Sequence, residues 1–156
     1  MATTTKDHTA AAPKDDGSGL TLLGKSGTAY PDRVDPSILE TFPNAHAGRE
    51  YTVTFETAEF TSLCPITGQP DFGTISVRYV PGKSCIESKS LKIYLFSYRS
   101  EPAFMETLTN RILDDLWAAC RPVEMTVTGE FAARGGVSIT VEATRSARKT
   151  AGAGSW

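Results

Sequence analysis

The stretch VEMTVTGEFAARGGVSITV, residues 123–141, decides the fold. Apolar or small residues occupy every second position from Val123 to Phe131, and polar residues fill the positions between them. The same alternation returns from Val137 to Val141, after the tripeptide Arg134-Gly135-Gly136. A period of two is typical of a strand with one buried face, and adjacent glycines are typical of a tight turn. The stretch therefore predicts an antiparallel hairpin.

Two earlier segments alternate in the same way, and they predict two more half-buried strands. Their apolar positions are Tyr51, Val53 and Phe55 in the first segment and Ile75, Val77 and Tyr79 in the second.

Helical periodicity lies between the two pairs of strands. Pro102 suits a first helical turn, and Pro122 prevents the helix from continuing. The apolar face between them consists of Phe104, Leu108, Ile112, Leu116 and Ala119.

The segment that precedes this helix fits two structures. Leu91, Ile93 and Leu95 alternate as in a strand, whereas Leu91, Tyr94, Leu95 and Tyr98 form a helical stripe. Ser84 and Glu87 have the spacing of a capping box, which favours a helix. The predicted order is ββααββ, an α+β unit with a four-stranded antiparallel sheet and two helices on one face.

The length of 156 residues predicts one domain. Residues 1–19 are polar without an apolar period, and we expect a disordered tail. Residues 20–144 are expected to form the single domain, beginning with an extended arm, and residues 145–156 to fray.

Composition and charge exclude several classes of function. With 16 basic and 18 acidic residues, the net charge of −2 draws the chain neither to nucleic acid nor to an anionic membrane. The three cysteines form no CxxC pair, and the two histidines lack zinc-ligand spacing, so no metal site is predicted. No signal peptide or apolar run of membrane-spanning length is present, which predicts a cytoplasmic protein acting on a small molecule.

The segment Cys64-Pro65-Ile66-Thr67-Gly68-Gln69-Pro70-Asp71 combines a thiol, an acid and turn-forming residues. Two prolines and a glycine favour a reversing loop that could bring Asp71 back beside Cys64. A thiol attacks as the thiolate, and a group that gains negative charge during the attack needs a proton from a nearby acid. A lone cysteine before proline is also common as a small buried apolar residue.

Residues 60–99, FTSLCPITGQPDFGTISVRYVPGKSCIESKSLKIYLFSYR, resemble the NADPH-dependent 7-cyano-7-deazaguanine nitrile reductases of queuosine biosynthesis, a pathway of tRNA modification. The resemblance rests on the SLCPxTGQPDF block, on ESKSLKxY at residues 87–94 and on FAARGG at residues 131–136. It implies the tunnelling fold, in its short single-module form. It also implies a cytoplasmic homo-oligomer with active sites at subunit interfaces, which fits the need to protect the exposed edges of the sheet.

The resemblance implies a reduction of the nitrile to a primary amine with two NADPH. Cys64 would add to the nitrile carbon to give a thioimide, and Asp71 would protonate the nitrogen. The implied substrate-binding residues are Ile86, Glu87, Ser88, Phe104, Met105 and Glu106, and the implied cofactor-binding residues are Lys89, Lys92, Arg134 and Gly135. Neither a P-loop nor a GxGxxG motif is present, so NADPH would bind otherwise.

One position departs from the family pattern. Many members have Phe-His-Glu where this chain has Phe104-Met105-Glu106, and Met105 cannot carry a proton. Two other functions therefore stay open. One is a purine- or pterin-binding protein without reductase activity, and the other is an enzyme that attaches an amine to the nitrile without NADPH.

Overall fold

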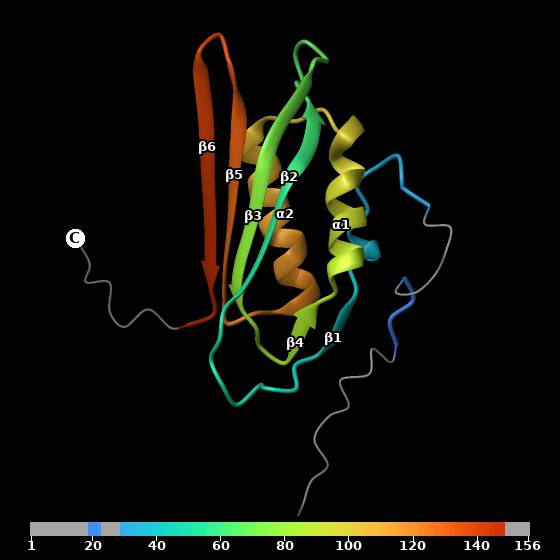
Figure 1. Ribbon diagram of the computed structural model, residues 1–156, viewed down its shortest axis with the longest axis vertical. Helices are drawn as coiled ribbons and strands as arrows, with labels where there is room; N and C mark the ends of the chain where they lie inside the picture. The colour runs from blue at the N-terminus through green and yellow to red at the C-terminus, as the bar shows by residue number, and fades with distance from the viewer. Residues whose placement is uncertain (1–18, 23–28, 149–156) are drawn as a thin grey trace, which may run out of the picture.

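The computed structural model describes residues 19–22 and 29–148 (Figure 1). The helical elements of these ranges are the 3-10 helices η1 (Pro36–Ile38) and η2 (Ser97–Ser100) and the α-helices α1 (Ser88–Phe96) and α2 (Met105–Cys120). The strands are β1 (Thr41–Pro43), β2 (Val53–Leu63), β3 (Pro70–Val80), β4 (Ser84–Ile86), β5 (Glu124–Arg134) and β6 (Val137–Ser146).

The main sheet has four strands in the order β2-β3-β5-β6, and every neighbouring pair is antiparallel. Both helices lie on one face of this sheet, with α2 against β5 and β6 and α1 beside β2 (Figure 1). This arrangement confirms the predicted α+β class and the ββααββ order. The hairpin that residues 123–141 predict is formed by β5 and β6, with Gly135 and Gly136 in the turn at φ of 57° and 81°.

The core lies between the sheet and the helices. Alternate side chains of β3 and β5 point into it, and the buried stripe of α2 covers them. Its fully buried members include Ile75, Val77, Met125, Val127, Leu108, Ile112 and Leu116. Each aliphatic side chain of this kind contributes about 1.5–3 kcal/mol when it leaves water, so these positions explain why the periodic segments fold together.

β2 and β3 are longer than the alternation predicts. The register of this pair shifts between Thr57 and Phe60, which is a β-bulge, and Phe60 is buried beyond it. The extra residues of the bulge change which positions face the core, so a period-two pattern that fits the first half of β2 does not continue into the second half. As a result, β2 reaches Leu63 and β3 begins at Pro70, next to the Cys64–Asp71 segment.

The predicted capping box is wrong. Ser84 and Cys85 belong to β4, which pairs with β1 through Thr41 and Ile86. Helix α1 begins only at Ser88, and Glu87 is its N-cap rather than its third residue. The pairing partner lies more than 40 residues earlier in the chain, so the local Ser-x-x-Glu spacing could not reveal it.

Two other boundaries differ from the expectations. Pro102 is not in the first turn of α2, because it forms a bridge with Leu63 and the helix starts at Met105. Strand β6 continues through Arg145 and Ser146, which were expected to fray. The predicted tail 1–19 and most of the predicted frayed end lie outside the described residues.

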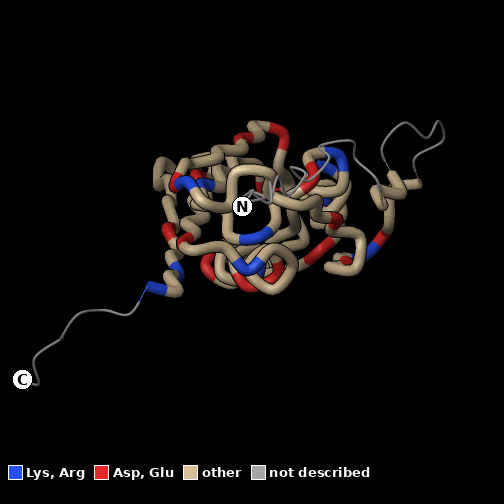
Figure 2. Tube along the Cα trace, turned by 90° about the horizontal axis from the view of Figure 1, so that it is seen from below, with Lys and Arg blue, Asp and Glu red and all other residues tan. Residues whose placement is uncertain are grey.

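Basic and acidic residues are spread around the molecule, with both signs on several sides of the trace (Figure 2). Among the described residues, no helix has the length and apolar character that crossing a membrane requires.

Candidate functional site

Cys64 lies in the turn that joins β2 to β3. Its N–H donates to the Gln69 carbonyl at 2.8 Å, and its carbonyl accepts from Gly68 N–H at 2.9 Å. Gly68 has a φ of 69°, a conformation that favours glycine. The turn therefore reverses the chain as predicted, and Asp71 pairs across the hairpin with Ser62, two residues before Cys64.

The surroundings of Cys64 lower the pKa of its thiol from 9.0 to about 7. The largest cause is a hydrogen bond from the Thr67 hydroxyl, followed by the backbone N–H groups of Thr67 and Ile66, with a smaller contribution from Arg134. Burial has the opposite effect on Cys120, whose pKa rises to about 12. Cys64 is only half-buried, so it combines access with a large thiolate fraction near neutral pH.

Asp71 is buried at the start of β3, and Arg134 of the β5–β6 hairpin reaches it. A guanidinium nitrogen of Arg134 lies 2.6 Å from Asp71 Oδ1, and the side chain of Asp71 is 6% exposed. The same nitrogen lies 3.3 Å from the carbonyl oxygens of Gln69 and Pro70. Arg134, which the resemblance assigned to the cofactor, therefore contacts the predicted acid and its turn.

The start of α2 lies beside the same turn. Ala103 N–H donates to the Leu63 carbonyl at 3.2 Å, which brings the first residues of α2 close to Cys64. Glu106 is exposed in the first helical turn, and no ion pair of its carboxylate is found among the described residues. Phe104 is 58% exposed and Met105 is partly buried against the core. We call Cys64, Asp71, Glu106 and Arg134 the Cys64 end.

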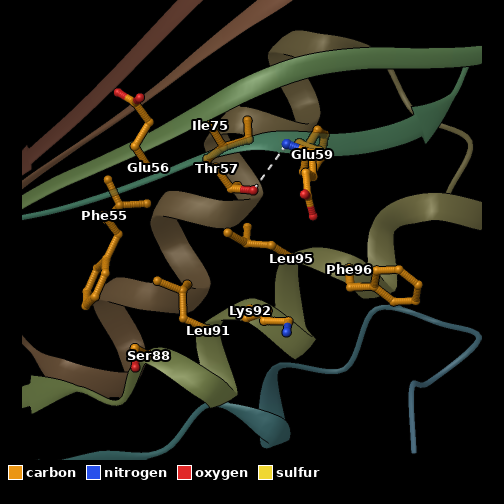
Figure 3. A pocket seen from close by; sticks show the side chains of 12 residues that line it. Phe55, Glu56, Thr57, Glu59, Ile75, Ser88, Leu91, Lys92, Leu95 and Phe96 are labelled. Carbon is orange, nitrogen blue, oxygen red and sulfur yellow. Dashed lines mark hydrogen bonds between the residues drawn. The ribbon is translucent and has the colours of Figure 1, made fainter.

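A groove of about 340 Å³ runs between α1 and β2 (Figure 3). Its wall on α1 includes Ser88 and Lys92, to which the resemblance assigned substrate and cofactor binding, and Glu59 of the β2 bulge lines the groove from the side of the sheet. The floor is apolar, with Leu91 and Leu95 from α1. We call this cavity the Ser88 groove.

Glu87, the residue before the groove, caps α1. Its carboxylate accepts from the N–H groups of Lys89 at 2.8 Å and Ser90 at 2.7 Å, and its side chain is buried. This capping role satisfies N–H groups that the helix leaves unpaired. Lys89 in turn donates to the Leu22 carbonyl at 2.6 Å, so the N-terminal arm lies over the start of α1. Gly135 lies far from this helix, exposed in the β5–β6 turn.

The predicted site residues lie at two ends of the fold (Figure 1). Ile86, just before α1, donates its N–H to the Tyr79 hydroxyl at 3.0 Å. Tyr79 is eight residues from Asp71 along β3, which corresponds to roughly 26 Å at about 3.3 Å per residue. One chain therefore brings together Cys64, Asp71, Glu106 and Arg134, and it keeps Ile86, Glu87 and Ser88 away from them.

Comparison with known proteins agrees with these motifs. The model of the family described as QueF-like protein matches residues 70–150. A relative from Syntrophus aciditrophicus, named NADPH-dependent 7-cyano-7-deazaguanine reductase, is 55% identical over 85% of this chain and 91% of its own length. The chain belongs to the QueF-like family. A relative with the same name from Bacillus licheniformis is 52% identical over 78% of this chain and 73% of its own.

The QueF-like fold is also found among solved structures. The crystal structure of the archaeosine synthase QueF-Like in the apo form is 29% identical, with a TM-score of 0.57 over 60% of this chain and 91% of that one. This likeness confirms the predicted tunnelling fold.

Two contacts of this QueF-like chain were missed by the sequence analysis. Thr67 was seen only as a turn residue, although it has the largest effect on the Cys64 thiol. The pairing of Arg134 with Asp71 joins two hairpins through residues that are 63 positions apart in the sequence. The Thr67 contact could have been suspected from its place in the turn, whereas the Arg134 contact has no local signal.

Proposed function

We propose that this protein reduces 7-cyano-7-deazaguanine to 7-aminomethyl-7-deazaguanine with two NADPH, through a thioimide on Cys64. The observation that carries the proposal is the accessible Cys64 thiol, whose pKa is lowered to about 7, in the turn of a hairpin that also holds the buried Asp71. The names of relatives that are more than 50% identical support the choice of substrate and cofactor.

The first step is the addition of the thiol across the nitrile. A bond forms between Cys64 Sγ and the nitrile carbon, one carbon–nitrogen π bond breaks, and its electron pair goes to nitrogen. The carboxylate of Asp71 takes the proton that the Cys64 thiol loses and delivers it to this nitrogen. The thiol loses one proton and the nitrogen gains one, so the addition needs no further acid. Thr67 supports the step because its hydroxyl stabilises the attacking thiolate.

The residues present suit the phosphates of NADPH, which supplies the two hydride equivalents of the reduction when it is bound. Lys89 and Lys92 on α1 are cations, and the backbone N–H of Gly135 lies in an exposed turn. The N–H groups of Lys89 and Ser90 at the start of α1 cannot bind a phosphate, because they already donate to the Glu87 carboxylate. Lysine side chains, rather than the helix end, would therefore hold the anionic groups.

Recognition of the base is assigned to the exposed carboxylate of Glu106. A carboxylate offers two acceptors to the N–H and amino groups of a guanine-like ring, and it rejects rings that lack them. Phe104 and Met105 lie next to it and offer apolar and sulfur contacts to the ring. Ser88 is exposed and donates only a long hydrogen bond of 3.5 Å to Glu87, so its hydroxyl can take part, whereas Glu87 caps the helix and would contribute through its backbone.

A complete site needs a second copy of the chain. The Cys64 end and the start of α1, with Ile86, Glu87 and Ser88, lie at opposite ends of one copy, so a substrate that touches both must lie between two copies. Exposed apolar side chains at the Cys64 end support such a contact, with Ile66 78% and Phe72 60% exposed. The outer strands β2 and β6 have edges through which copies could pair into a ring.

The deciding experiment mixes the protein with the nitrile and follows two signals. Intact-mass spectrometry without NADPH should show a covalent adduct on the wild type, and the nicotinamide absorbance should fall when NADPH is added. Cys64→Ala should show neither signal and should melt like the wild type. Binding without an adduct would indicate the binding protein, and an adduct that reacts with an added amine without loss of NADPH would indicate the amine-attaching enzyme.

A further inference from the structure

We propose that Arg134 is a positioning residue for the addition of Cys64 to the nitrile, because its guanidinium ties the buried acid Asp71 to the turn that carries the thiol. The inference rests on the proposed function. It gives Arg134, to which the resemblance assigned cofactor binding, a role in a step that needs no cofactor.

The contacts of Arg134 converge on the Cys64 turn. The guanidinium pairs with Asp71 Oδ1 at 2.6 Å and lies 3.3 Å from the Gln69 carbonyl. This carbonyl also accepts the N–H of Cys64 at 2.8 Å, so it is shared by the nucleophile's backbone and by Arg134. The arginine therefore braces the acid and the closure of the turn at the same time.

The backbone that presents Arg134 is well defined. Arg134 pairs with Val137 across a two-residue turn, and Gly135 and Gly136 both have positive φ, as a type I′ turn requires. A register shift between Phe131 and Arg134 further sets the direction of the side chain. Arg134 thus extends from the end of a strand that closes in a tight two-residue turn, which suits a residue that must hold another group in place.

Asp71 depends on this contact. Among the described residues, Arg134 is the ion-pair partner found for its carboxylate, which is almost fully buried. A buried carboxylate without a partner is strongly unfavourable. Without Arg134, the Asp71 side chain would therefore rotate toward solvent, or its charge would repel the thiolate of Cys64. A displacement of about 1 Å in a reacting group can slow a reaction on the order of 100-fold.

Arg134 also acts on the thiol. Its hydrogen bond lowers the pKa of Cys64 in the same direction as Thr67, although less strongly. The charged groups of the neighbouring elements include Asp71 on β3, Glu106 on α2, Glu59 on β2 and Glu130 on β5, and Glu101 is paired with Arg111 at 2.7 Å. Among these groups, Arg134 is the cation whose hydrogen bond reaches the Cys64 thiol.

The first experiment measures the rate of nitrile addition without NADPH by quenched intact-mass spectrometry. We expect Arg134→Gln to slow the addition on the order of 10- to 100-fold. Arg134→Lys should be intermediate, because an ammonium keeps the charge opposite Asp71 but its side chain is shorter and lacks the planar guanidinium. Arg49→Gln removes the same charge from an exposed loop and should leave the rate unchanged.

The second experiment measures the alkylation of Cys64 by iodoacetamide as a function of pH, without nitrile or NADPH. The wild-type rate should rise with a midpoint near pH 7. Arg134→Gln should move the midpoint upward, and Thr67→Val should move it further. Cys85 and Cys120 are buried, so a single label on the native protein reports Cys64.

The inference is overturned if Arg134→Gln adds the nitrile at the wild-type rate with an unshifted midpoint and changes only the KM for NADPH. If the wild type itself forms no adduct, the proposed function fails. The difference in alkylation midpoint between the wild type and Arg134→Gln then still tests whether Arg134 acts on the Cys64 thiol. If Arg134→Gln does not fold, the double variant Asp71→Asn/Arg134→Gln removes the unpaired charge. Its midpoint should exceed that of Asp71→Asn alone, and equal midpoints would reject the inference.

Discussion

Ser62 is fully buried on β2, and its hydroxyl has no hydrogen-bond partner among the described residues. It lies directly across the hairpin from Asp71, two positions before Cys64. An unsatisfied buried hydroxyl typically costs about 1–3 kcal/mol. The unpaired hydroxyl of Ser62, which lies beside Asp71, therefore lowers the stability of the fold.

We predict that Ser62→Ala leaves the free energy of unfolding unchanged or raises it by up to about 1 kcal/mol, because it removes the unpaired hydroxyl. Chemical denaturation measures this change. Ser97→Ala is the matched control: Ser97 is equally buried, but its hydroxyl donates to the Tyr94 carbonyl at 2.6 Å, so the loss should be about 1 kcal/mol. A clear loss of stability in Ser62→Ala would show that the hydroxyl has a partner in solution.

The two helices are joined by a buried chain of hydroxyl groups. The Tyr94 hydroxyl donates to Asp115 of α2 at 2.6 Å and lies 2.7 Å from the Tyr98 hydroxyl. Since each hydroxyl carries one proton, Tyr98 must donate to Tyr94. Burial raises the pKa of Tyr94, so its proton stays in place to complete the chain.

We predict that Tyr94→Phe lowers the free energy of unfolding by about 1–3 kcal/mol, because the buried Tyr98 hydroxyl and the partly buried Asp115 carboxylate each lose a partner. Urea denaturation gives the value. Tyr30→Phe is the control: the Tyr30 ring packs on Phe96 but is 42% exposed, so its loss should stay within about 0.5 kcal/mol. Equal effects of the two substitutions would mean that the hydroxyl chain does not couple the helices.

The elements that the sequence predicts well are those with an uninterrupted period. β5 follows its pattern as far as Phe131, and α2 follows its pattern from Leu108 to Leu116. β6 forms as predicted, but Val137 and Ile139, which were expected on a buried face, are exposed, and the second half of β2 is hidden beyond the bulge at Thr57. β1 and β4 were missed because three-residue strands have no usable period, and their pairing is distant in sequence. The same limit applies to the site: the Cys64 turn is local and was predicted, but its contact with Arg134 depends on the packing of two hairpins.

The whole assembly can be tested by mixing inactive chains. Cys64→Ala should inactivate the Cys64 end, and Lys92→Glu, at an exposed position of α1, should inactivate the Ser88 groove. If each site takes one end from each of two copies, a 1:1 mixture unfolded and refolded together should regain about a quarter of the wild-type activity. Each variant refolded alone should stay inactive, and so should the mixture if each chain holds a whole site.

The distance between the two ends of one chain has a genetic consequence. In the proposed assembly, every polypeptide serves two catalytic centres and completes neither alone. A cell that makes equal amounts of normal chain and of chain damaged at one end would keep about half of its centres, and damage at both ends would leave about a quarter. Two different recessive alleles could then rescue each other, whereas a doubly damaged allele would behave as partly dominant.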